Sequence, residues 1–174
     1  METLSLVRPT AVLEKSCLAA RDEFFALDGQ EYMSYLPGIV EDFPDFLQRL
    51  QAREAGIDLP PGLVAQSAYW LVRNGCEIVG QVALRYHLTP LLKIEGGHIG
   101  YAIRPTERRK GYGTRILALI LEIARAKGFT RVLVTCNTEN IGSARIIQKN
   151  GGIFEGEASS PYTGKPVSRY WIEL

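Results

Sequence analysis

The sequence predicts a single α/β domain with a mixed, mostly antiparallel sheet. Its 174 residues, 46% of them hydrophobic, suffice for one domain with a sizeable core. Two β-rich runs, Val64–Val72 and Glu77–Leu88, are joined by Asn74-Gly75, the strongest short-range signal for an antiparallel hairpin. A third run, His98–Arg104, leads through a glycine-containing loop into an amphipathic helix. Strands interspersed with helices in this order are typical of an α/β fold.

The chain up to Gly56 predicts one strand and two helices. Leu4–Arg8 can form a short strand that Pro9 ends. Val12–Phe25 has helical spacing, with an apolar face made of Leu13, Cys17, Ala20 and Phe24. A second helix begins after Asp42, a candidate N-cap, and ends at Gly56.

The segments after the glycine-containing loop continue the alternation. The helix that follows this loop ends at Gly128, and Arg131–Cys136 has the composition of a buried strand. A helix over Ile141–Lys149 comes next, and two final strands are expected at Ile153–Ala158 and Ser168–Leu174.

Composition argues against several classes of protein. A formal net charge of +1 does not favour general binding to nucleic acid. The three cysteines, Cys17, Cys76 and Cys136, are widely spaced and show no metal-binding pattern, so we expect reduced thiols in a cytoplasmic protein without a metal site. The sequence shows no basic-then-apolar leader and no apolar run near the ~20 residues of a spanning helix, so no membrane role is expected.

The segment Arg104–Thr114 carries the clearest chemical signal. It joins a predicted strand to a helix, and Gly111 and Gly113 permit backbone angles that a Cβ would forbid. Free N–H groups and partial positive charge at the start of the helix favour an anion. Full positive charges stand beside them on Arg108, Arg109 and Lys110. We therefore expect a phosphate group to bind here.

Two better-known phosphate loops fit this chain less well. A P-loop needs Ser or Thr after Gly-Lys, whereas Gly164-Lys165 is followed by Pro166. The dinucleotide fingerprint needs a third glycine where Ile116 stands, and no parallel βαβ series surrounds the motif. A further alternative is a basic glycine turn that only caps a helix.

The motif Arg108-x-x-Gly111-x-Gly113 resembles the pyrophosphate-binding motif of the GNAT superfamily of acyl-CoA-dependent N-acetyltransferases. A second match is Asn140-x-x-Ser143, where the family commonly has Asn-x-x-Ala. The order of predicted elements is similar to the whole GNAT fold, so the resemblance covers residues 1–174 as a single domain. It implies a mixed sheet of about six or seven strands, flanked by about four helices, with splayed central strands.

Two further runs narrow the resemblance. Gly97–Tyr101 and Arg169–Ile172 resemble a bacterial subfamily of acetyltransferases that has no assigned acceptor. The family resemblance places acetyl-CoA between the strands His98–Arg104 and Arg131–Cys136 and implies no metal. The implied cofactor-binding residues are Ile103, Arg108, Arg109, Lys110, Gly111, Tyr112, Gly113, Thr114, Asn140 and Ser143. Ile103 could alternatively be a core residue and Asn140 a helix cap.

The implied reaction is the attack of an amine on a thioester carbonyl. A base must take the proton of the acceptor amine. His98 stands where some family members carry a catalytic glutamate, and Glu95 lies three residues earlier. His98 titrates near neutral pH and could act as the base, or it could be a hydrogen-bonded structural residue.

The group that protonates the leaving thiolate is not assigned by the resemblance. Many family members place a tyrosine seven residues after the position of Asn140, but Ile147 stands there. Tyr170, Tyr162 and Cys136 are candidate acids, and each could be structural instead. A thiol is a tolerable leaving group without an acid, so activity remains possible.

The predicted function is N-acetyl transfer from acetyl-CoA to a primary amine. In the family, the acceptor site is bordered by segments that here are residues 28–45 and 159–167. The first is acidic, and with aromatic surface from Tyr32, Tyr35 and Tyr162 it favours a small cationic amine. Two alternatives stay open, a CoA-binding sensor without turnover and a protein N-acetyltransferase; a homodimer is also compatible with the sequence.

Overall fold

The fold is a seven-stranded sheet with helices on both faces. A computed structural model describes residues 2–28 and 41–174. The strand order is β1-β2-β3-β4-β5-β7-β6, and the pairing is antiparallel everywhere except between β4 and β5. The strands are β1 (Leu4–Val7), β2 (Gln66–Arg73), β3 (Glu77–Arg85), β4 (Ile99–Ile103), β5 (Arg131–Asn137), β6 (Ile153–Ser159) and β7 (Pro166–Glu173).

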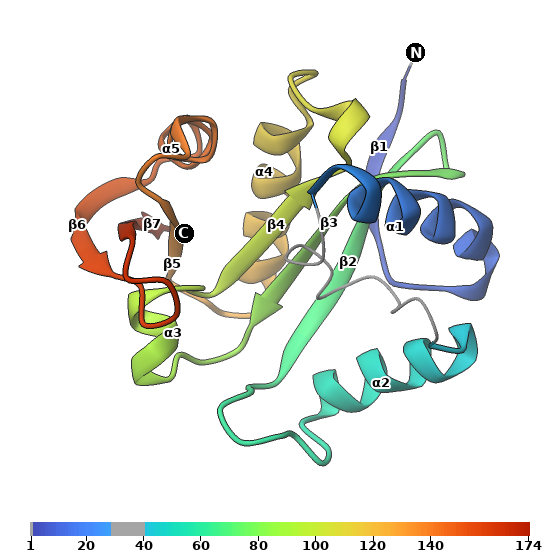
Figure 1. Cartoon of the computed structure of the whole chain (residues 1–174), viewed down its shortest axis with the longest axis horizontal. Helices are drawn as coiled ribbons and strands as arrows, with labels where there is room; N and C mark the ends of the chain where they lie inside the picture. Colours follow the sequence, from blue (N-terminus) through green and yellow to red (C-terminus); the bar gives the residue numbers. More distant parts are fainter. Residues whose placement is uncertain (1, 29–40) are drawn as a thin grey trace.

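Five α-helices surround this sheet in the described part of the chain. They are α1 (Glu14–Asp28), α2 (Phe43–Ala55), α3 (Pro90–Ile94), α4 (Tyr112–Ala126) and α5 (Ile141–Lys149). Helices α1 and α2 cover one face of the sheet, and α4 covers the other (Figure 1). Every helix in residues 2–28 and 41–174 is too short or too polar to cross a membrane.

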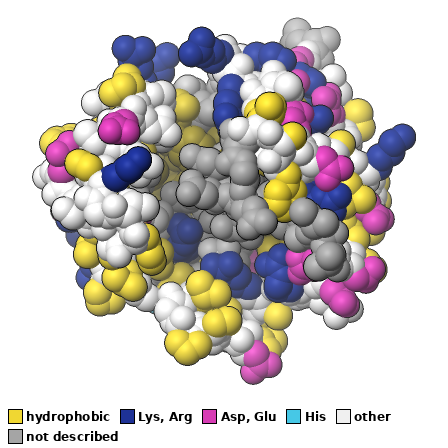
Figure 2. Space-filling model, viewed as in Figure 1, with side chains coloured by type: hydrophobic (Ala, Val, Ile, Leu, Met, Phe, Trp, Pro, Cys, Tyr) yellow, Lys and Arg dark blue, Asp and Glu magenta, His cyan; other side chains and the backbone are white. Residues whose placement is uncertain are grey.

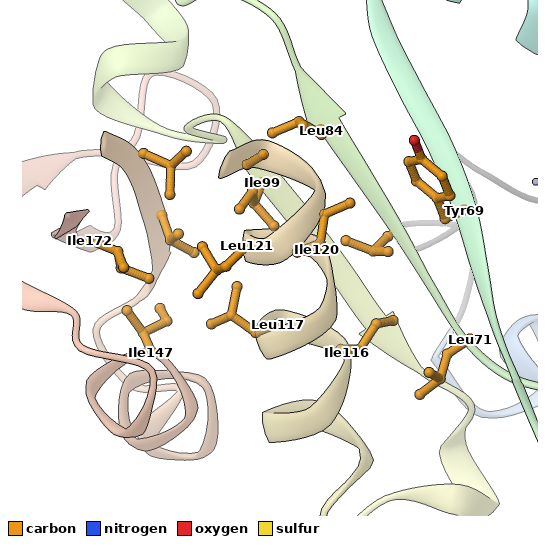
Figure 3. Packing of buried hydrophobic residues seen from close by; sticks show 14 of the residues in the cluster. Tyr69, Leu71, Leu84, Ile99, Ile116, Leu117, Ile120, Leu121, Ile147 and Ile172 are labelled. Carbon is orange, nitrogen blue, oxygen red and sulfur yellow. The ribbon is translucent and has the colours of Figure 1, made fainter. Parts of the chain in front are cut away.

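The two faces of the sheet have separate hydrophobic cores. On the α1–α2 face, Phe46 stacks on Trp70 of β2 with ring centroids 6.4 Å apart. On the opposite face, Leu117 and Leu121 of α4 point toward Ile147 and Ile172, whereas Ile116 and Ile120 point toward Leu71 and Tyr69 (Figure 3). Full burial of each such side chain contributes about 1.5–3 kcal/mol. Helix α4 is therefore held firmly, and so is the loop that leads into it.

The predicted hairpin is confirmed between β2 and β3. Asn74 and Gly75 have left-handed φ values of 51° and 73°, the backbone conformation that these residue types favour in a tight turn. The fold class and the order of the other predicted elements are confirmed as well.

The end of the predicted strand Glu77–Leu88 is wrong. Strand β3 stops at Arg85, and the unpredicted short helix α3 follows. Thr89 caps α3 by accepting a hydrogen bond from the Leu92 N–H (3.2 Å), and Pro90 occupies its first turn. Asp42 stands at the N-cap of α2, as predicted, but its side chain makes no capping hydrogen bond. The predicted connection between α1 and α2, with Glu31, Tyr32 and Tyr35, lies outside the described residues.

The central strands β4 and β5 diverge. Within the described chain their ladder consists of the single pair Ile99–Val134. Beyond this pair, β4 continues to bond to β3 as far as Ile103, while β5 continues to bond to β7 as far as Asn137. Beyond this pair the facing edges of β4 and β5 do not bond to each other, which matches the implied splay, and the Ile103 carbonyl at the end of β4 accepts a hydrogen bond from Arg108 Nε (3.2 Å).

Candidate active site

The larger of two adjoining clefts opens beside the divergence of β4 and β5. This larger cleft has a volume of about 430 Å³ and lies between β4, the loop before α4 and the start of α5. Its lining residues are Tyr101, Ala102, Ile103, Glu107, Arg108, Arg109, Gly113, Asn140, Gly142, Ser143 and Ile146. Lys and Arg side chains gather along the upper edge of Figure 2, over α5 and the loop before α4. A long, phosphate-bearing molecule fits this combination of an open strand edge and a basic rim.

The loop before α4 has the predicted left-handed backbone at Gly111, whereas Gly113 lies within the helix and does not have a positive φ. Gly111 is the N-cap of α4 with a φ of 87°, and Arg109 also has a positive φ of 63°. The first intrahelical donors are the N–H groups of Thr114 and Arg115, which bond to the Gly111 carbonyl at 3.1 and 3.2 Å. The preceding N–H groups have no helical partner, so they are available to an anion.

Gly113 is required for a close approach between two helices. A Cβ at this position would lie 2.5 Å from Cδ1 of Ile146 on α5. The glycine therefore lets α5 approach the start of α4, and the two helix starts border the same cleft.

Ion pairs around the buried Glu107 carboxylate support the loop before α4. The Glu107 carboxylate accepts hydrogen bonds from Arg73 (2.9 Å) and Lys110 (3.0 Å). Burial by itself would raise the pKa of Glu107, but the hydrogen bonds from Lys110 and Arg73 hold this pKa below its usual value. Arg73 also donates to Tyr112 Oη (3.0 Å). The predicted phosphate contacts Lys110 and Tyr112 thus have side chains that support the loop, whereas Arg108 and Arg109 line the cleft.

A second ion pair anchors the entry to the loop. Glu23 of α1 accepts a hydrogen bond from the Thr106 N–H (2.6 Å) and pairs with the Arg104 guanidinium. Although burial opposes it, the pKa of Glu23 is lowered by these two partners.

A smaller cleft of about 230 Å³ adjoins the larger one. Its lining residues are Arg85, Glu95, Gly96, Ile99, Gly100, Tyr101, Thr135, Cys136, Asn137, Asn140, Ser143 and Val167. Tyr101, Asn140 and Ser143 line both clefts, so the clefts meet at the divergence of β4 and β5. Asn140 caps α5 by accepting a hydrogen bond from the Ser143 N–H (3.0 Å). Asn140 therefore caps a helix and also lines both clefts.

Glu95 lies in the smaller cleft. Its carboxylate accepts a hydrogen bond from Ser160, which is 4% exposed and belongs to the connection between β6 and β7. The Arg85 guanidinium lines the same cleft and donates to the carbonyls of Gly96 (2.9 Å) and Gly97 (3.1 Å). A carboxylate and a guanidinium thus face the same space, both held by neighbouring groups.

His98 is not among the residues that line either cleft. Its Nδ1 accepts a hydrogen bond from the Leu133 N–H (2.8 Å), and its ring packs against Phe129 and Trp171. Burial, with help from Arg85 and Arg131, lowers the pKa of His98 to about 4. The histidine therefore ties the start of β4 to β5, and this geometry favours the structural alternative over the role of base.

Tyr170 is also placed away from the two clefts. It is 5% exposed, belongs to the core under α4 and contacts Phe154 with ring centroids 5.5 Å apart. Burial raises the pKa of Tyr170. Ile147, at the position of the family's tyrosine, is fully buried in the same core. Tyr162 is 71% exposed, and of the candidate acids only Cys136 lines a described cleft.

The sequence prediction missed Tyr101 and Ser160. Tyr101 lines both clefts, and its Oη lies 2.9 Å from Ser143 Oγ. Ser160 belongs to no motif, and Tyr101 ends the run Gly97–Tyr101, to which no site role was assigned. Each residue reaches the clefts through the pairing of distant segments. The described residues contain no cluster of three or more His, Cys, Asp or Glu side chains that could hold a metal ion.

The splayed strands and the glycine-containing loop match the arrangement that the family resemblance implies for an acyl-CoA site. The family model for the acetyltransferase (GNAT) domain matches residues 12–153. The chain therefore belongs to the GNAT acetyltransferase family and is an acyltransferase. A comparison with curated protein sequences gives no match.

Solved structures share this fold at low sequence identity. The microcin C7 self-immunity acetyltransferase MccE, in complex with acetyl-CoA and AMP, is 14% identical, with a TM-score of 0.68 over 98% of this chain and 92% of that one. A Salmonella typhimurium acetyltransferase that modifies the N-terminal serine of a 50S ribosomal subunit protein is 15% identical, with a TM-score of 0.69 over 99% and 95%. A GNAT-family acetyltransferase from Bacillus anthracis is 18% identical, with a TM-score of 0.67 over 98% and 94%.

Proposed function

We propose that this protein transfers the acetyl group of acetyl-CoA directly to a primary amine that binds in the smaller cleft. The observation that carries the proposal is the meeting of the two clefts at the divergence of β4 and β5. One cleft ends at a loop suited to a pyrophosphate, and the other contains a carboxylate. A thioester at the junction is therefore reachable by an amine from the opposite side.

The proposed cofactor contacts begin at the loop. The N–H groups of residues 109–113 bind the pyrophosphate, with charge supplied by Arg108 and Arg109. The pantetheine arm lies along the open edge of β4 near Ile103, where backbone groups face the splay. Asn140 and Ser143 border the same path from the start of α5.

Glu95 is the proposed base. An acceptor amine with a pKa near ~10.4 is mostly protonated at neutral pH and must lose a proton before it attacks. The Glu95 carboxylate lines the smaller cleft and is oriented by Ser160, so it can accept that proton directly or through a water molecule. The amine nitrogen then bonds to the thioester carbonyl carbon, and the carbon–sulfur bond breaks.

The proposed acceptor is a small cationic amine. Glu95 supports this because an ammonium group gains a partner in the smaller cleft before it is deprotonated. Of the carboxylates that motivated the same expectation, Glu31 lies outside the described residues. Glu41 is described, but its carboxylate is already paired with Arg49 at 2.7 Å. The alternative acceptor is a protein N-terminus, the substrate type stated for the Salmonella enzyme.

Release of free thiol from acetyl-CoA, measured across a panel of amines, tests the proposed function. The panel includes a polyamine, an aminoglycoside-type amine, neutral and acidic amino acids, and peptides with free N-termini. We expect Glu95→Gln to lower kcat/KM by roughly 10²-fold or more, in line with a lost general base. Glu122→Gln, on the exposed side of α4, is the matched control and should have no effect. A Glu95→Gln variant with wild-type turnover would exclude this base, and a preference for acidic acceptors would exclude the cationic acceptor.

A further inference from the structure

Ile147 of α5 cannot donate a proton to the leaving thiolate. This side chain is aliphatic and has no exposed surface. It packs in the core with Gly152 against it, since a Cβ on that glycine would lie 2.4 Å from Ile147 Cγ2. No rearrangement of this residue could deliver a proton to the splay between β4 and β5.

A phenol from the neighbouring strand stands in the splay instead. Tyr101 is the third residue of β4, and its Oη lies 2.9 Å from Oγ of Ser143 in the first turn of α5. Either oxygen can be the donor of this hydrogen bond. Tyr101 and Ser143 both line both clefts, so the pair stands where the bound cosubstrate meets the acceptor.

We infer that Tyr101 is the general acid that protonates the sulfur of coenzyme A as it leaves, with Ser143 relaying a replacement proton from solvent. The inference rests on the proposed function of direct acetyl transfer. The amine, after giving its ammonium proton to Glu95, forms a bond from nitrogen to the carbonyl carbon, and the electron pair of the broken carbon–sulfur bond goes to sulfur. Sulfur takes the Tyr101 proton, and the phenolate recovers one from solvent through Ser143. The nitrogen loses its second proton to solvent as the amide forms, and Glu95 releases its proton to solvent before the next turnover, so one proton is released overall.

The surroundings of Tyr101 keep its phenol protonated. Burial raises the pKa of Tyr101 to about 12, the Ser143 hydrogen bond lowers it in part, and Cys136 raises it. The Tyr101 phenol therefore keeps its proton over the pH range around the thiol pKa of ~8.5. It can donate that proton to the leaving thiolate. The titratable and charged groups that line the same two clefts are Cys136 on β5, Glu95 after α3, Arg85 on β3, and Glu107, Arg108 and Arg109 in the loop.

Tyr101→Phe tests the assignment because it removes one oxygen and retains the ring. We expect kcat to fall by roughly 10²-fold with little change in the dissociation constant of acetyl-CoA. Tyr86→Phe is the matched control, because Tyr86 is also a hydrogen-bonded tyrosine, donating to Glu54 at 2.8 Å, but it lines neither cleft. This control should retain wild-type kcat.

A second measurement separates proton donation from a structural effect of the hydroxyl. Site-specific replacement of Tyr101 by 3,5-difluorotyrosine lowers the phenol pKa without removing the oxygen, so general acid catalysis predicts that the basic limb of the kcat profile moves to lower pH. Ser143→Ala should lower kcat less than Tyr101→Phe does. An active wild-type enzyme whose Tyr101→Phe variant keeps wild-type kcat, or whose basic limb does not move in the fluorinated variant, overturns this inference alone. A wild-type enzyme that releases no thiol with any amine overturns the proposed function together with it.

Discussion

The larger and the smaller cleft differ in how the chain builds them. Most residues that line the larger cleft belong to one continuous stretch, 101–113, which contains the cations and the helix start, and the start of α5 supplies the rest. The smaller cleft is assembled from segments far apart in the chain, including Arg85, Glu95, Cys136 and Val167. The proposed acetyl-CoA site is therefore mostly local in sequence, whereas the proposed acceptor site depends on contacts between segments far apart in the chain.

The two clefts also differ in how they are supported. The buried Glu107 carboxylate, paired with the half-buried Arg73 and the exposed Lys110, supports the phosphate loop. The residue proposed as base in the smaller cleft has a single described side-chain partner, Ser160, on a connection between strands. Changes in the loop should therefore alter binding of acetyl-CoA, and changes in the smaller cleft should alter turnover and acceptor choice.

The largest expected effect on binding comes from Gly111→Val. Gly111 and Gly128 have the same φ of 87°, and a Cβ added to either would have no heavy atom within 4 Å, so valine should strain both backbones by at least about 1–2 kcal/mol. Only Gly111 belongs to the phosphate loop. Loss of one or two charge-assisted hydrogen bonds should weaken acetyl-CoA binding about tenfold to a hundredfold in Gly111→Val. Calorimetric titration of both variants measures the difference, and equal affinities would break the assignment of the loop.

His98 gives the next largest effect, and it should be on stability. Replacing the ring with alanine leaves the buried Leu133 N–H without its acceptor, which should cost about 1–3 kcal/mol in the free energy of unfolding. His98→Asn retains a side-chain acceptor and should cost less. Turnover per folded molecule should stay near the wild-type value in both. A large loss of kcat in a fully folded His98→Asn enzyme would restore His98 as a candidate base.

The pKa of His98 adds a pH signature to this prediction. The folded-state value of about 4 lies below the ordinary value of 6.5, so the unfolded chain binds the proton more readily. The contribution of neutral His98 to stability is therefore complete above pH 6.5 and is lost as the pH falls toward 4. Thermal unfolding of the wild type should show this slope, and His98→Asn should flatten it.

The structure shows which parts of the molecule could be predicted from the sequence. The hairpin at Asn74-Gly75 and the anion loop were predicted because the required backbone conformation is encoded by the residues that adopt it. His98 was predicted to begin the strand that in the structure begins at Ile99, and the sequence does not show that its ring turns toward Leu133. Nor does it show that Tyr101 reaches Ser143, because that contact depends on how far β4 and β5 diverge.

A smaller effect is expected from Glu107→Gln, which weakens the support of the loop at a residue that also lines the larger cleft. The folded-state pKa of Glu107 is lowered, so the ionised carboxylate stabilises the fold above the unfolded-state pKa of about 4.3, and this contribution is lost as the pH falls through the folded-state value. We expect a lower midpoint of thermal unfolding at neutral pH and a shallower decline in acid than in the wild type. Affinity for acetyl-CoA should fall several-fold, by about 1 kcal/mol. An unchanged midpoint would show that the Arg73–Glu107 pair contributes nothing measurable.

The smallest effect should come from Glu41→Gln, and it separates the carboxylate inside the smaller cleft from one in the acidic segment before α2. Glu41 already accepts hydrogen bonds from Arg49 at 2.7 and 3.1 Å, so its field on an incoming ammonium is largely cancelled by its partner. An exposed ion pair of this kind is also screened beyond about 8–10 Å in physiological salt. The specificity constant for a polyamine should therefore change less than about twofold in Glu41→Gln, at low and at high salt, while Glu95→Gln loses far more. A salt-dependent loss of tenfold or more in Glu41→Gln would instead show that the segment before α2 attracts the acceptor, and that selection begins outside the smaller cleft.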